Sequence, residues 1–86
     1  FTDRTPPQNI EAEQAVLGAI FINDEALVSA SERLVPEDFY RASHQRIYSV
    51  MLSLAQKGEP VDLITVTTEL QTKNWLDEVG GVSYLS

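Results

Sequence analysis

Apolar side chains recur at helical spacing along much of this 86-residue sequence. The clearest case lies near the middle of the chain, where the apolar positions follow the i, i+3, i+4, i+7, i+8 rule of one helix face. These positions are Ile47, Val50, Met51, Leu54 and Ala55. A basic residue, Lys57, and then Gly58 follow, as they commonly do where a helix ends. The pattern predicts a helix from about Ser43 to Lys57.

Two shorter helices are predicted before it. The first begins after Asn9, a residue type that favours the N-cap position. Its expected apolar face comprises Ala12, Val16, Ala19 and Ile20, widened by Leu17 and Phe21. Gly18 costs about 1 kcal/mol relative to alanine inside a helix, so it predicts close packing against a neighbouring helix.

The second short helix is expected from about Glu25 to Leu34. Its predicted buried stripe comprises Leu27, Ala30, Ser31 and Leu34. Val35-Pro36 ends it, because a residue before proline avoids the α region. Pro36 can then open a short helical turn that carries Phe39 and Tyr40.

The segment from Val61 to Leu70 carries conflicting signals. Its β-branched run at positions 64–68 favours a strand. Against that, Asp62 is a good N-cap and the residues after it keep helical spacing. Because no second strand is available nearby to pair with it, we predict a helix. One more turn is expected at Leu76–Val79, and residues from 82 onward begin another helix.

Together these elements predict an all-α fold, a compact bundle of five or six short helices. Residues 1–8, with Pro6-Pro7, are expected to form a flexible N-terminal arm, and residues 9–86 a single helical domain. The chain starts at Phe1 rather than methionine, and its last residues have an apolar pattern with no stop signal. We therefore expect it to be part of a longer protein, truncated at its C-terminal end.

The charge balance narrows the possible partners. Six lysines and arginines stand against thirteen aspartates and glutamates, for a net charge of −7. Nucleic-acid binding depends on neutralising phosphates with basic side chains, so direct DNA binding is not expected. A basic protein partner fits better. No cysteine is present, which fits a cytoplasmic protein, and neither a signal peptide nor a membrane span is visible.

No catalytic, cofactor-binding or metal site is predicted in this chain. None of its four glycines begins the G-x-x-x-x-G-K-[ST] loop that binds nucleotide phosphates. His44, the only histidine, falls on the apolar stripe and is interpreted as a core or capping residue, with a role as base or ligand as the alternative. The carboxylate pairs Glu11/Glu13 and Glu37/Asp38 lie at helix starts, where they complement the helix dipole.

Several sequence blocks in order resemble the DnaB-type replicative DNA helicases. The first is the run from Pro7 to Gly18, PQNIEAEQAVLG, and the second is Phe39-Tyr40 followed by His44 and Ile47. The others are the run GEPVD at 58–62 with Thr65-Val66 and Leu70, and then Val79-Gly80-Gly81 with Tyr84-Leu85. Trp75 is not part of the pattern.

The resemblance implies a non-catalytic N-terminal head of a hexameric bacterial helicase at the replication fork. In that family a helical hairpin, a linker and a motor domain using ATP and magnesium follow the head. The head contributes to a collar of subunits and docks the C-terminal domain of the primase. None of the family's ATPase residues has a counterpart in these 86 residues.

Candidate partner-binding residues lie near the end of the chain. Tyr84 is the candidate aromatic anchor, since tyrosine is enriched at interfaces. Asp77 and Glu78 are the candidate rim charges for a basic partner. Three alternatives stay open: a helix-turn-helix DNA-binding domain, a small hydrolase using His44, and the helicase-binding domain of a primase.

Overall fold

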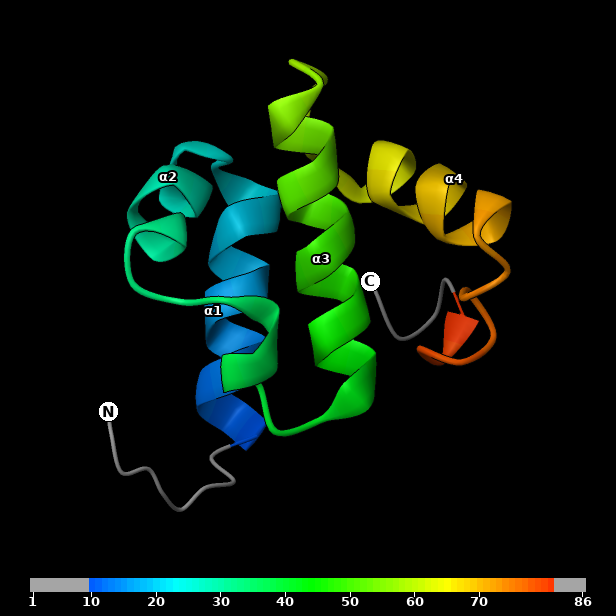
Figure 1. Cartoon of the computed structure of the whole chain (residues 1–86), viewed down its shortest axis with the longest axis horizontal. Helices are drawn as coiled ribbons and strands as arrows, with labels where there is room; N and C mark the ends of the chain where they lie inside the picture. Colours follow the sequence, from blue (N-terminus) through cyan, green and yellow to red (C-terminus); the bar gives the residue numbers. More distant parts are fainter. Residues whose placement is uncertain (1–9, 82–86) are drawn as a thin grey trace.

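The structure, a computed structural model, describes residues 10–81, and within them the chain forms four α-helices and one short 3-10 helix (Figure 1). In chain order these are α1 (Ile10–Ile22), α2 (Glu25–Ser31), η1 (Pro36–Asp38), α3 (Ala42–Gln56) and α4 (Leu63–Thr72). The all-α class is confirmed. The predicted arm, the Asn9 cap and the helix expected from Val82 lie outside the described residues.

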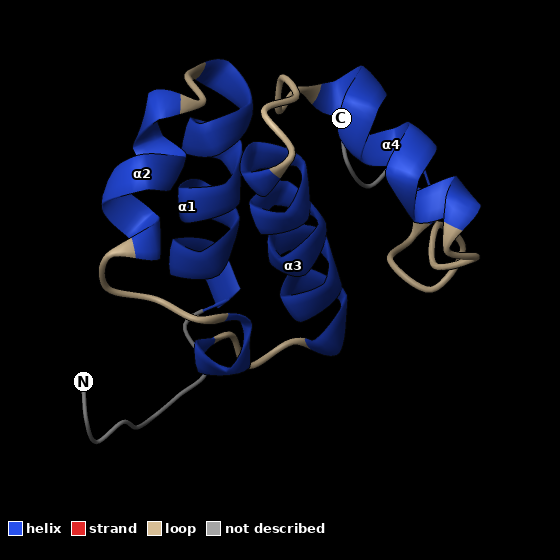
Figure 2. Ribbon diagram, turned by 45° about the horizontal axis from the view of Figure 1, so that its top comes forward, coloured by secondary structure: helices blue, strands red, loops and turns tan. Residues whose placement is uncertain are grey.

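Helix α3 is the centre of the fold. It contacts α1 and α2 on one side and α4 on the other, and η1 covers it near its start (Figure 2). Its buried stripe matches the prediction at four of the five positions, the exception being Ala55, which is exposed at the last turn. Gly58 follows with a φ of 74°, the left-handed conformation expected of a C′ glycine.

One apolar core joins the helices. Every element except η1 contributes a buried side chain, and the loops add three more at Phe39, Val61 and Val79. The buried apolar residues are Leu17, Ile20, Leu27, Phe39, Ile47, Tyr48, Val50, Met51, Leu54, Val61, Val66, Leu70 and Val79. Because α3 supplies five of them, its position fixes the positions of the other helices.

The start of α4 shows why the β-branched segment is helical. The Asp62 side chain accepts a hydrogen bond from the Thr65 amide at 2.9 Å, and the Asp62 amide donates to Thr65 Oγ1 at 2.9 Å. This reciprocal capping satisfies amides that would otherwise lack partners in the first turn. The cap, together with the burial of Val66 and Leu70 against α3, outweighs the strand preference of the threonines and valine.

The first two helices differ from the prediction in phase and length. Leu17 and Ile20 of α1 are buried, but Ala12 and Ala19 are exposed. Helix α2 ends at Ser31, three residues before the predicted Leu34, and Ser31 itself is exposed. Helix α1 is apolar on nearly all sides, so its sequence pattern does not indicate which side α2 and α3 cover.

No neighbouring helix packs closely against Gly18, although a glycine inside α1 suggested that one would. A Cβ atom built on Gly18 would meet no described atom within 4 Å. The expectation of tight packing at this glycine is therefore wrong. Nothing in the described residues explains why glycine occupies this helical position.

Candidate functional site

A polar junction joins the start of α1 to the start of α3. The carboxylate of Glu13 accepts hydrogen bonds from the amide of Tyr40 at 2.6 Å and from that of Arg41 at 3.5 Å. Its Oε1 atom also lies 2.7 Å from Nδ1 of His44. We call these four residues the Glu13 junction. An ionised carboxylate can only accept, so Nδ1 of His44 carries the hydrogen in this contact.

The contact between Glu13 and His44 is largely removed from solvent, so the loss of either partner costs more free energy than it would at the surface. The side chains of His44 and Glu13 are 1% and 13% exposed. The ring of Phe39 meets the imidazole edge-on, with centroids 6.4 Å apart. His44 is therefore a core residue with a polar partner, as its position on the apolar stripe suggested. The role of Glu13 was missed, because its partners lie 27 to 31 residues away.

Tyr48 provides a second buried polar contact beside this junction. Its hydroxyl donates a hydrogen bond to the carbonyl of Leu34 at 3.0 Å, which ties α3 to the loop after α2. Burial raises the pKa of the Tyr48 hydroxyl above its ordinary value, and the negative charge of Asp38 raises it further. The neutral hydroxyl is thus the form that the fold favours.

The candidate rim charges lie beside a cluster of Trp75, Arg46 and Lys73. The Arg46 guanidinium carbon lies 4.6 Å from the Trp75 ring centroid, and Lys73 Nζ lies 5.5 Å from it. Arg46 Nε also contacts Glu78 Oε1 at 3.0 Å. Trp75 is half-buried, and its two cationic neighbours were not foreseen from the sequence.

The predicted partner-binding residues are brought together only in part. Asp77 and Glu78 are both exposed, in the turn after Trp75. Glu78 is held by Arg46 through side chains that are themselves substantially exposed, so this ion pair contributes little to stability. Tyr84 lies outside the described residues.

Residues 10–81 contain neither a metal-binding cluster nor a helix that could span a membrane. In this range no group of three or more histidine, aspartate or glutamate side chains is arranged to hold a metal ion. None of the helices in the same range combines the length and the apolar character that crossing a bilayer requires.

A family model described as the DnaB-like helicase N terminal domain matches residues 5–86. The chain belongs to this family. This membership confirms the resemblance carried by the sequence blocks. It also argues against the hydrolase and primase alternatives, and it agrees with the expectation that this domain is not an enzyme by itself.

Individual relatives of this DnaB-like domain agree with the assignment. The chain is 65% identical over 86 residues to the replicative DNA helicase DnaB of Geobacillus stearothermophilus. It is 67% identical over 84 residues to the replicative DNA helicase DnaC of Bacillus subtilis. These matches cover 100% and 98% of this chain but only 19% and 18% of the relatives. The chain thus spans about a fifth of those whole helicases.

The fold agrees with a solved structure of the same kind of domain. The crystal structure of the N-terminal domain of DnaB helicase from Mycobacterium tuberculosis superimposes with a TM-score of 0.90 at 44% identity. The match covers 94% of this chain and 59% of that one. Sequence and structure therefore place this DnaB-like domain in the same family.

Proposed function

We propose that this chain is the assembly and docking domain of a hexameric replicative DNA helicase. In this proposal it contributes to the collar of subunits and docks the C-terminal domain of the primase at the bacterial replication fork, in the cytoplasm. Unwinding, with ATP and magnesium as cofactors, belongs to a motor domain elsewhere in the parent protein. The family membership of residues 5–86 is the observation that carries the proposal.

Electrostatics support a protein partner over DNA. The net charge is −7, and among residues 10–81 three basic side chains are engaged in ion pairs with carboxylates. Arg46 pairs with Glu78, while Lys57 and Lys73 both approach Glu69. An acidic domain whose cations are partly neutralised repels phosphates and attracts a basic protein surface. This argues against the helix-turn-helix alternative.

The proposed primase contact combines Tyr84 with the acidic turn at Asp77 and Glu78. A buried aromatic anchor governs the dissociation rate, whereas rim charges govern the association rate and its salt dependence. Because Arg46 holds Glu78 at 3.0 Å, the Glu78 carboxylate offers less free charge to a partner than the Asp77 carboxylate. Asp77 is thus expected to contribute more of the steering.

Surface plasmon resonance with the primase C-terminal domain at low and high salt tests the proposal. Tyr84→Ala should raise the dissociation rate at both salt concentrations. Asp77→Asn combined with Glu78→Gln should mainly slow association, and mainly at low salt. Glu59→Gln is the matched control, because Glu59 is exposed and lies in the loop between α3 and α4.

Two negative outcomes would distinguish an error in the proposed binding site from an error in the proposed docking role. If the wild-type chain binds and Tyr84→Ala leaves both rates unchanged, the interface lies elsewhere on the domain. If the full-length helicase also fails to bind the primase domain, the docking role itself is wrong.

A further inference from the structure

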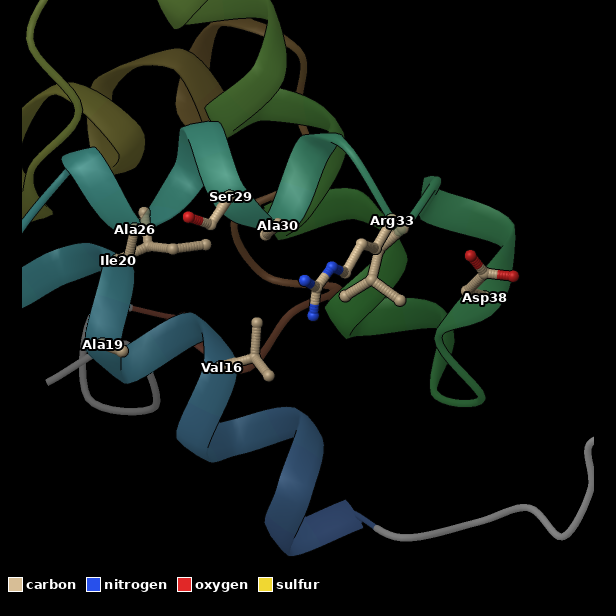
Figure 3. A pocket seen from close by; sticks show the side chains of 9 residues that line it. Val16, Ala19, Ile20, Ala26, Ser29, Ala30, Arg33 and Asp38 are labelled. Atoms are coloured by element: carbon tan, nitrogen blue, oxygen red, sulfur yellow. The ribbon is translucent and has the colours of Figure 1, made fainter. Parts of the chain in front are cut away.

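A groove of 690 Å³ runs between α1 and α2 and ends at η1 (Figure 3). Ile20 is fully buried at its base, whereas Ala19 and Ser29 on its walls are exposed, so the groove is an open trough. Its lining residues are Val16, Ala19, Ile20, Ala26, Ser29, Ala30, Arg33, Leu34 and Asp38. An open trough with few polar groups does not enclose a small molecule.

The walls suit the apolar face of a helix. Ala26, Ser29 and Ala30 of α2 share one face at i, i+3 and i+4 spacing, and Arg33 lies in the turn that follows the helix. Three of these side chains are small, which leaves room for larger side chains from outside. The seven residues of α2 extend about 10 Å, which matches about two turns of a docked helix, and a longer helix would extend beyond α2.

Charged residues next to the lining residues in the sequence indicate which charge a docked helix would carry beside its apolar face. Residues 24–38 contain five carboxylates and one base, Arg33. In the described part of the chain, the exposed carboxylates of Glu25, Glu32 and Glu37 form no ion pair. The Arg33 side chain extends over the trough, and its guanidinium does not pair with Asp38 (Figure 3).

The acidic residues beside the groove favour a different protein over a second copy of this chain as its occupant. A second copy would bring another net charge of −7 to an acidic rim. Because like charges placed across an interface disfavour association, that occupant is electrostatically disfavoured. A helix with basic residues on both sides of its apolar stripe would place the apolar stripe in the trough and its basic residues near the carboxylates on either side.

We propose that the groove between α1 and α2 docks an amphipathic helix with a basic flank, supplied by a protein partner. The helices α1 and α2, between which the groove lies, are on the opposite side of α3 from the turn after α4 (Figure 1), and that turn contains Asp77 and Glu78. The groove is therefore a second docking surface, and it does not depend on the primase contact proposed above.

The test uses two 18-residue helical peptides and amide chemical shifts of the whole 86-residue chain. Both peptides carry the same leucine stripe, flanked by lysine in one and by glutamate in the other. The lysine peptide should shift the amides of Val16, Ala19 and Ala30, and the glutamate peptide should bind at least about tenfold more weakly. Equal binding of the two peptides, or shifts confined to other surfaces, would overturn the proposal.

Paired variants separate the groove from the rest of α2. Ser29→Trp fills the trough and should lower the affinity for the lysine peptide about tenfold or more. Val28→Trp is its matched control and should leave the affinity unchanged, because Val28 is 63% exposed and does not line the trough. Glu25→Lys should slow association, and Glu59→Lys is its matched control. Equal effects within either pair would contradict the assignment. A dimer of the wild-type chain that Ser29→Trp abolishes would show a second copy as the occupant and overturn the choice of partner.

Discussion

Helix α3 is attached to its neighbours by two different kinds of contact. Near its start, the buried carboxylate of Glu13 joins it to α1 through His44 and two backbone amides. Near its end, α3 packs on α4 as part of the apolar core to which Leu54 belongs, and the pair between Lys57 and Glu69 lies at the surface, with Nζ and Oε2 3.7 Å apart. Removal of a buried charged partner leaves polar groups that water cannot reach, whereas water replaces a lost partner at the surface. We therefore expect the carboxylate of Glu13 to matter more to the stability of this fold than the exposed pair between Lys57 and Glu69.

Loss of the apolar attachment should have the largest effect. Leu54→Ala removes a side chain that is 2% exposed and leaves a cavity between helices. The free energy of unfolding should fall by about 2–4 kcal/mol. Urea denaturation measures this change. A midpoint equal to that of the wild type would show that the end of α3 does not depend on apolar packing.

Loss of the polar attachment should have a somewhat smaller effect. Glu13→Ala removes the carboxylate that contacts the His44 imidazole and accepts from the Tyr40 amide, which should cost about 1.5–3 kcal/mol. Glu11→Ala is the matched control, since Glu11 lies in the same first turn and is exposed. Similar losses in the two variants by urea denaturation would mean that helix-dipole effects, and not the Glu13 junction, explain the result.

Tyr48→Phe tests the neutral polar contact beside the Glu13 junction. Loss of the hydrogen bond to the Leu34 carbonyl should cost about 1 kcal/mol. Because the folded state raises the pKa of Tyr48, its contribution is complete below about pH 10 and is lost as the pH rises through the raised value. The difference in urea midpoint between wild type and variant should therefore shrink above pH 10. A difference that stays constant up to pH 11 would contradict the raised pKa.

The exposed ion pair should matter least. Lys57→Ala removes a side chain that is 51% exposed, and the free energy of unfolding should change by no more than about 0.5 kcal/mol. Thermal unfolding at low and high salt would detect any larger contribution. A loss comparable to that of Glu13→Ala would remove the distinction between the two ends of α3.

Features that depend on nearby residues could be predicted from the sequence, whereas contacts between distant residues could not. Helix α3, the Asp62 cap and the Gly58 terminus follow from local spacing and local chemistry, and the structure agrees with each. The Glu13 junction joins residues up to 31 positions apart, and no periodic pattern encodes such a contact. The contact of Arg46 with Trp75 was missed for a related reason, because Arg46 lies in α3, far from Trp75 in the sequence.

The exposed side of α1 could not be predicted either. Its sequence is apolar on nearly every side, so the pattern does not indicate which side faces the core. Leu17 and Ile20 are buried because α2 and α3 lie against them, whereas Ala19 remains on the wall of the groove. Only the arrangement of the three helices shows that part of α1 is available to a partner.

The docking role is tested most directly by competition. Full-length helicase is captured on immobilised primase C-terminal domain, and the 86-residue chain is then added in excess. The account predicts that the chain displaces the helicase, and that raising the salt concentration weakens the displacement because the contact is electrostatically assisted. A helicase that binds the primase domain normally and is not displaced at any chain concentration would contradict the proposal that this domain carries the docking surface.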